Sequence, residues 1–165
     1  PRYEALIRAR NVAVSPSDSD LTTRYEFDHP LAAIWNWITD LNCRNAAMGE
    51  MGQWKIISRN QGRTAPGASN HCAHGKGASI ETILDWRPFE YTTIESADGP
   101  VVFHETIRFA ALDEKRTRVE VYLQMRKPKP LFLARLMLKR EFGKENPYVK
   151  WFDRINELAG KGSAE

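Results

Sequence analysis

The sequence predicts an α+β fold in which a curved antiparallel sheet wraps around a C-terminal helix. Three observations lead to this prediction. A strand pattern and two short helical patterns occupy residues 21–48, six strand patterns follow between Trp54 and Arg126, and a helical pattern closes the chain. The connections between the six strands are short, which favours antiparallel neighbours because a parallel pair needs a long crossover. Packing the closing helix on the curved sheet leaves a cavity between them.

The chain opens with a polar stretch. Residues 1–20 start with a short helical or strand pattern and become Ser-Pro-Ser-Asp-Ser-Asp at positions 15–20. This cluster has little apolar surface to bury, so an N-terminal arm or linker is predicted over residues 1–20. The first strand then alternates, and one of its sides carries Leu21, Thr23, Tyr25 and Phe27.

Two short helices are predicted after this strand. Pro30 suits a first helical turn, where its missing N–H costs nothing. Asp40 marks a break, and a second helix over residues 41–48 is stopped by Gly49. The apolar residues of the first helix recur at helical spacing and are Ile34, Trp35 and Ile38.

Six further strands are predicted from alternating and β-branched or aromatic residues. Turn-forming residues such as those of Asp98-Gly99-Pro100 separate them. The strands cover residues 54–59, 68–74, 79–86, 91–96, 101–111 and 118–126.

The closing segment is rich in leucine and basic residues. Residues 131–138 are apolar almost all around a helix, which predicts burial on several sides. Gly143 and Pro147 are expected to kink or break the helix. A single apolar stripe then resumes with Tyr148, Trp151, Ile155 and Leu158.

Composition bounds the class of protein. With 165 residues and 42% hydrophobic content, we expect one globular domain over residues 21–160 and a disordered tail over 161–165. Cys43 and Cys72 make no disulfide framework, and the chain has no secretory signal, so a cytoplasmic protein with reduced thiols is expected.

A chain that begins at Pro1 has either lost its initiator methionine or is a fragment with an attached domain. Both remain open.

Several motifs resemble those of the START-like superfamily (SRPBCC), which includes polyketide cyclase/dehydrase and lipid-transport proteins. The family's opening motif is matched by Phe27, Pro30, Ile34-Trp35 and Ile38-Thr39-Asp40. Its second signature is matched by residues 67–75 and by Asp85–Tyr91. A third departs from the pattern, because Lys115-Arg116-Thr117-Arg118 lacks the usual glycine. Residues 71–75 and 86–91 are also similar to modules associated with class III nucleotide cyclases.

This resemblance implies a helix-grip (START/Bet v 1-like) fold over residues 21–160. It implies no single activity, because the family hosts binders, transporters, cyclases and co-chaperones. In this fold, cavity mouths lie near the position of Trp54, where an aromatic ring can cover a ligand or simply pack.

Glu105 is the strongest candidate for a functional side chain. It shares a strand face with the large apolar residues Phe103 and Ile107. If that face lines the cavity, desolvation raises the pKa of the carboxyl. Such a group can anchor a ligand hydroxyl or amine, or act as a general acid or base. The alternative is a position near a sheet end or a pair with an arginine.

His71 and His74 invite a metal-site interpretation. Residues three apart on a strand point to opposite faces, so the two rings do not converge on one ion without a bulge. We therefore predict no metal site and no cofactor, with His71 as a polar group of the cavity. The full predicted ligand-binding set is Glu105, His71, Phe103, Ile107, Trp54, Val121, Leu123, Leu138 and Phe142.

The leading functional hypothesis is binding of a small hydrophobic ligand, such as a lipid, polyketide or aromatic metabolite, which could regulate an attached domain. One alternative is a polyketide cyclase or dehydratase that uses Glu105 or a cavity histidine. No catalytic dyad, nucleophile elbow or phosphate loop occurs, so nothing in the sequence requires an enzyme.

Another alternative is a co-chaperone-like interaction module. Residues 126–144 hold seven basic residues and one acidic residue, a net charge of +6. This charge either snorkels from a packed helix or docks an acidic protein partner, and a membrane contact is less favoured. Nucleic acid is not an expected partner, because the net charge is only +3 and no nucleic-acid motif occurs.

Overall fold

The computed structural model describes residues 12–49, 52–74, 77–128, 132–133, 136, 138, 140 and 146–161. The strands are β1 (Leu21–Phe27), β2 (Gln53–Ser58), β3 (Ser69–His74), β4 (Gly77–Arg87), β5 (Tyr91–Asp98), β6 (Val101–Ala111) and β7 (Thr117–Lys127). The helices are α2 (Leu31–Thr39), α3 (Leu41–Met48) and α5 (Pro147–Lys161).

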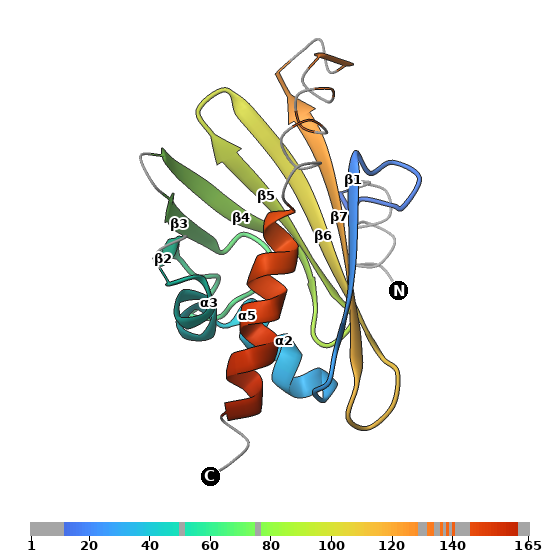
Figure 1. The fold of residues 1–165 in the computed structure, drawn as a ribbon. Helices are drawn as coiled ribbons and strands as arrows, with labels where there is room; N and C mark the ends of the chain where they lie inside the picture. Colours follow the sequence, from blue (N-terminus) through green and yellow to red (C-terminus); the bar gives the residue numbers. More distant parts are fainter. Residues whose placement is uncertain are drawn as a thin grey trace, which may run out of the picture.

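The strands form one antiparallel, 7-stranded sheet in the order β1-β7-β6-β5-β4-β3-β2. The sheet curves, α5 lies across its concave side, and α2 and α3 pack beside α5 (Figure 1). Tight turns make this order possible, and in the β5–β6 turn Gly99 adopts a φ of 53°, which glycine tolerates best. The predicted α+β class, with a curved sheet wrapped around the C-terminal helix, is confirmed.

The strand predictions agree with the structure closely. Strand β6 has the predicted bounds, and the ends of the other predicted strands differ from the observed ends by no more than two residues. Asp40, predicted as a break, ends α2 and also caps α3. Its carboxylate accepts the backbone N–H groups of Asn42 and Cys43 at 2.9 and 3.1 Å. Pro147 begins α5, as its fixed φ and missing N–H favour.

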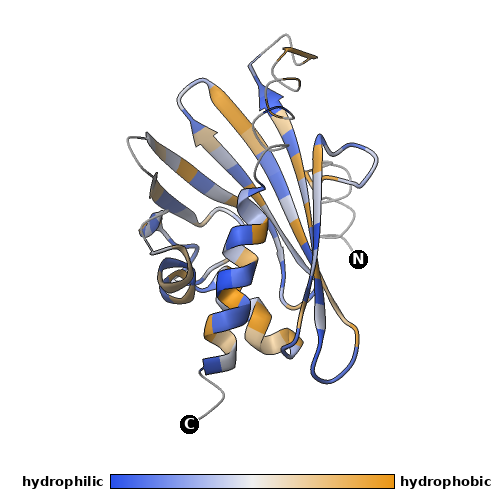
Figure 2. Ribbon diagram, in the orientation of Figure 1, coloured by the Kyte–Doolittle hydropathy of each residue, from blue (hydrophilic) through white to orange (hydrophobic). Residues whose placement is uncertain are grey.

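The core fills the space between α5, α2 and the concave side of the sheet. Phe27 on β1 meets Phe152 on α5 edge-on, with ring centroids 5.4 Å apart. Ile34 and Ile155 are fully buried in the same cluster. Hydrophilic residues lie along the side of α5 turned away from the sheet (Figure 2). The stripe predicted for this helix is thus the side that grips the sheet.

The convex side of the sheet is partly covered by the segment before β1. The Val14 N–H donates to Thr106 Oγ1 at 2.8 Å, and Val14 is 1% exposed. Asp20 Oδ2 accepts the N–H of Met125 at 2.9 Å. Thr106, on the convex side of β6, is completely buried. Residues 1–11 and 162–165 lie outside the described residues, so their predicted arm and tail stay predictions.

The leucine-rich segment differs from its prediction. Burial on several sides was expected for residues 131–138, yet Phe132, Leu133 and Leu136 are 67%, 51% and 66% exposed. Leu138 is buried and packs with Leu123 and Met125. Pro147 begins α5, and this helix lies across the concave side of the sheet (Figure 1). No helix in the described part of the chain is long and apolar enough to cross a membrane.

Candidate ligand-binding cavity

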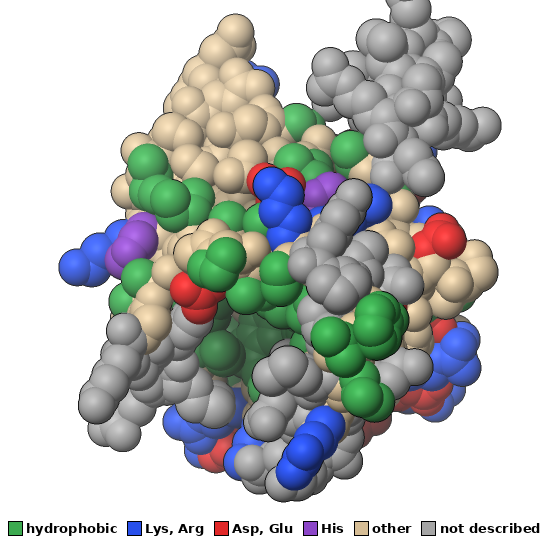
Figure 3. Space-filling view, turned by 90° about the horizontal axis from the view of Figure 1, so that it is seen from above, with side chains coloured by type: hydrophobic (Ala, Val, Ile, Leu, Met, Phe, Trp, Pro, Cys, Tyr) green, Lys and Arg blue, Asp and Glu red, His purple; other side chains and the backbone are tan. Residues whose placement is uncertain are grey.

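A cavity of about 430 Å³ lies between the first turns of α5, helix α3 and the concave side of the sheet. The face seen from above is hollowed, with hydrophobic side chains in the hollow (Figure 3). The large apolar residues of the cavity wall are Met48, Trp54, Ile94, Phe103, Leu123 and Trp151. The polar side chains of the wall are Arg44, Cys72, Ser79, Glu81, Ser96, Glu105 and Tyr148. Polar side chains are as numerous as large apolar ones, but most of the surface that the wall presents to the cavity is apolar.

Strand register brings these residues together. Ile94, Glu105 and Leu123 are direct partners across β5, β6 and β7 and form one row of the wall. Ser96 pairs with Glu81 on one side and Phe103 on the other, which makes the adjacent row. Because side chains alternate along a strand, both rows face α5.

Glu105 and Tyr148 join the two sides of the cavity. The Tyr148 hydroxyl on α5 donates a hydrogen bond to the Glu105 carboxyl on β6. Loss of hydration raises the pKa of Glu105, and the negative charge of Glu81 adds to the rise, while the Tyr148 bond and Arg44 oppose it. Burial and the neighbouring Glu105 also hold the pKa of Tyr148 well above its usual range. Both groups are therefore biased toward their neutral, protonated forms.

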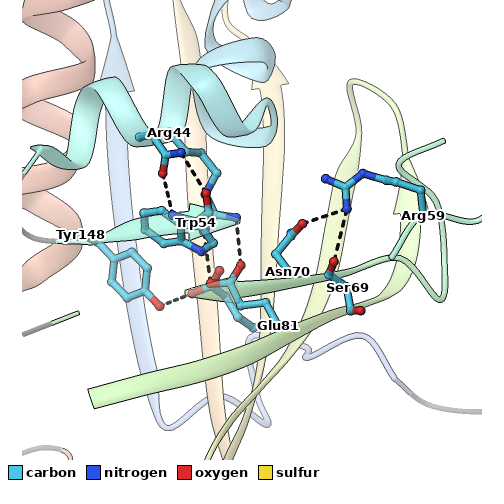
Figure 4. Close-up of polar contacts among 9 residues, drawn as sticks. Arg44, Trp54, Arg59, Ser69, Asn70, Glu81 and Tyr148 are labelled. Carbon is cyan, nitrogen blue, oxygen red and sulfur yellow. Dashed lines mark hydrogen bonds and ion pairs between the residues drawn. The ribbon is translucent and has the colours of Figure 1, made fainter. Parts of the chain in front are cut away.

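Arg44 and Glu81 form a buried ion pair in the same wall. Two nitrogens of the Arg44 guanidinium donate to the two Glu81 oxygens at 3.1 and 3.3 Å. The guanidinium also lies 4.2 Å from the centroid of the Trp54 ring and 5.7 Å from that of Trp151. Arg44 reaches from α3 toward Glu81 on β4, with Trp54 beside it (Figure 4). The positive charge of Arg44 and the negative charge of Glu81 therefore balance each other within the wall.

Three N–H donors of the residues that form the wall have no acceptor among the described residues. They are Nε of Arg44 and the indole nitrogens of Trp54 and Trp151, all buried. Cys72 has its pKa raised to about 11 by burial and by the charge of Glu81, so it remains a thiol at neutral pH. No group of three or more potential metal ligands occurs within the described residues.

A second, smaller cavity of about 200 Å³ adjoins the first. Arg44, Glu81 and Ile94 border both cavities, so the ion pair stands between them. Ile107 borders the smaller cavity only.

Some of the predicted site residues line the main cavity and others do not. Four of them, Glu105, Phe103, Trp54 and Leu123, line the main cavity. Ile107 and Val121 lie one step along the same strand faces and belong to the core that packs against α5 and α2. Leu138 contacts Leu123 from outside the wall. Phe142 lies outside the described residues.

The prediction placed His71 on the wrong face of β3. Its neighbours Asn70 and Cys72 border the two cavities. Alternation therefore turns His71 the other way, level with its strand partners Lys55 and Ile80, which are exposed. It does not line the cavity.

Sequence reasoning missed Arg44, Glu81 and Tyr148. Tyr148 carried a usable signal, because it stands three residues before Trp151 on the apolar stripe that predicts the sheet-facing side of α5. Arg44 and Glu81 carried none locally, since each looks like a surface residue until its partner, 37 positions away, is known.

Comparison with known proteins gives the fold without an activity. No protein-family model matches the chain, and no curated protein matches it. A crystal structure from Nitrosomonas europaea aligns over 92% of this chain and 100% of its own, at 16% identity and a TM-score of 0.67. One from Thermus thermophilus aligns over 87% of this chain and 99% of its own, at 15% identity and a TM-score of 0.67.

A third similar structure is DynU16, described as a putative protein in the dynemicin biosynthetic locus. It aligns over 89% of this chain at 13% identity and a TM-score of 0.62. The alignment spans 49% of DynU16, so this chain corresponds to about half of that protein. At identities this low, all three likenesses establish the fold and nothing finer.

Proposed function

We propose that this protein binds a small hydrophobic ligand in the cavity between α5 and the sheet. The cavity itself carries the proposal, because about 430 Å³ of space with a mainly apolar wall lies beneath a gripping helix. Ligand sites in proteins are typically concave, roughly 300–1,000 Å³ in volume and mostly apolar, with a few polar groups that fix orientation. Glu105 and Tyr148 provide such groups here. A lipid, polyketide or aromatic metabolite fits this description.

The motifs at Pro30 and at Asp85–Tyr91, together with the fold, support assignment to the START-like superfamily. The likeness of residues 71–75 and 86–91 to cyclase-associated modules supports a regulatory variant of this proposal, in which the bound ligand controls an attached domain. Fold alone hosts many functions, so the site has to carry the argument.

A catalytic role is the second candidate, and the Glu105–Tyr148 pair favours it. A carboxyl with a raised pKa on a cavity wall can exchange a proton with a ligand, as a polyketide cyclase or dehydratase requires. The location of DynU16 in a biosynthetic locus lends this candidate some support. Turnover that is lost in Glu105→Gln while binding persists would establish it.

Native mass spectrometry of the purified chain tests the binding proposal. We expect an adduct in the native spectrum that disappears in the denatured spectrum. Ser96→Phe, which fills the cavity, should remove the adduct. Ala97→Phe, at the next position and on the opposite face of β5, should retain it. An adduct of equal intensity in Ser96→Phe would place the ligand elsewhere and overturn the proposal.

A further inference from the structure

The positive charge in the wall of the cavity is already paired with a carboxylate of the same wall. Arg44 is the only basic side chain that lines the cavity within the described residues. Both of its terminal nitrogens are committed to Glu81, at 3.1 and 3.3 Å. A ligand anion would therefore add negative charge beside Glu81 without gaining a free cation. Buried charge without a partner is unfavourable, so this arrangement opposes carboxylate ligands.

Glu105 on β6 is the second carboxyl group that lines the cavity. It accepts from Tyr148 on α5, and the further charged groups that act on it are Glu81 on β4 and Arg44 on α3. Cys72 on β3 shares the wall and stays neutral. Because its surroundings favour the protonated carboxyl, Glu105 has one O–H to donate while its other oxygen accepts from Tyr148.

The Glu105 carboxyl, held from α5 by Tyr148, is a polar group of the wall that can donate to a ligand when it is protonated. A ligand oxygen with lone pairs can accept from this O–H. An ammonium group cannot, because it has only donors.

From these contacts we propose that the cavity selects a neutral ligand that carries an acceptor oxygen, such as a ketone or hydroxyl. The Arg44–Glu81 pair discriminates against carboxylates, and the Glu105–Tyr148 pair holds the ligand oxygen. This inference rests on the proposed binding function and narrows it to one class of ligand.

Three ten-carbon probes test the inference by calorimetry, each below its own aggregation concentration: 2-decanone, decanoate and decylammonium. They share chain length and differ in charge and in hydrogen-bonding capacity. For the wild-type chain we expect 2-decanone to bind at least about tenfold more tightly than either ion. Ser96→Phe should abolish the binding of 2-decanone, and Ala97→Phe should leave it unchanged.

Two isosteric variants separate the roles of the carboxyls. Glu105→Gln keeps a neutral donor, so 2-decanone should still bind. Binding should weaken with rising pH in the wild type but not in this variant, and 2-decanone itself does not titrate. Glu81→Gln frees the positive charge of Arg44, so decanoate should gain about tenfold or more in affinity. If Glu81→Gln does not fold, the wild-type series and Glu105→Gln still decide the question.

Two results would overturn the inference while leaving the binding function intact. Decanoate that binds the wild type as tightly as 2-decanone would show that Glu81 does not exclude anions. Decylammonium that binds most tightly, and is lost in Glu105→Gln, would make Glu105 the counter-ion of a cation site. Failure of all three probes to bind the wild type would instead contradict the proposed function itself.

Discussion

The Tyr148 hydroxyl donates a hydrogen bond to the Glu105 carboxyl across the cavity, between residues 43 positions apart in the chain. This bond connects the first turn of the gripping helix to the middle of the sheet. It also lies beside the apolar residues Phe103 and Leu123, where hydration is poor. A shift of α5 that breaks this bond would therefore change both the polar surface of the cavity and the pKa of Glu105.

The stability of the protein should depend on pH through Glu105. The folded state raises the pKa of this carboxyl above its unfolded value, so the folded state holds a proton that the unfolded state has lost. The sign follows: the free energy of unfolding is highest below the unfolded pKa and falls as pH rises through the folded pKa. Glu105→Gln replaces the titrating carboxyl with an amide, so the free energy of unfolding should no longer fall over this pH range. Urea unfolding at a series of pH values measures this free energy.

The same experiment has a clear contrary result. If wild type and Glu105→Gln show parallel pH profiles above the ordinary range of a glutamate, the carboxyl is ionised in the folded protein. Tyr148→Phe serves as the second variant, because it removes a donor that stabilises the ionised form of Glu105 and should extend the fall in stability to higher pH.

The Arg44–Glu81 pair should show strong non-additivity in stability. Arg44→Met leaves the Glu81 carboxylate buried without its partner and should lower the free energy of unfolding by about 3–5 kcal/mol. The double variant Arg44→Met/Glu81→Leu removes both charges and should recover most of that loss. Chemical denaturation of the single and double variants provides the measurement. Equal losses in the single and double variants would mean that the pair is not buried as a unit.

The segment before β1 should be held to the sheet by Thr106. Thr106→Val removes the acceptor of the Val14 N–H and leaves that buried donor unpaired, at an expected loss of about 1–3 kcal/mol. Hydrogen exchange of the Val14 amide should accelerate in the same variant. Thr106→Ser keeps the hydroxyl and should preserve slow exchange. Unchanged exchange in Thr106→Val would show that the contact does not hold the segment.

Much of the fold was predictable because its signals are local. Alternation and turn residues located β6 at its observed bounds, and the apolar partners Phe103 and Ile107 placed Glu105 on the concave side. Pro147 was expected to kink or break the closing helix because it cannot donate an N–H within a helix, and α5 begins at this residue. Each of these inferences depends on neighbours within one element.

The rest of the site depends on contacts between elements. In β4, Glu81 and Asp85 are buried while Ile80 is 49% exposed, the reverse of what hydropathy predicts. The ion pair with Arg44 offsets the cost of burying the Glu81 carboxylate. This pair becomes visible only when α3 is packed on the sheet. The error at His71 has a similar origin, because the facing of β3 is set by its pairing with β2 and β4. Local patterns cannot supply these relationships.

The indole N–H signals of the five tryptophans offer the most direct test of the cavity. Trp54 and Trp151 line it, whereas Trp35 is packed in the core away from it. In a titration of ¹⁵N-labelled protein with 2-decanone, the indole signals of Trp54 and Trp151 should shift in a saturable manner while that of Trp35 stays in place. Saturable binding that leaves Trp54 and Trp151 unmoved would put the ligand elsewhere and contradict a site between α5 and the sheet.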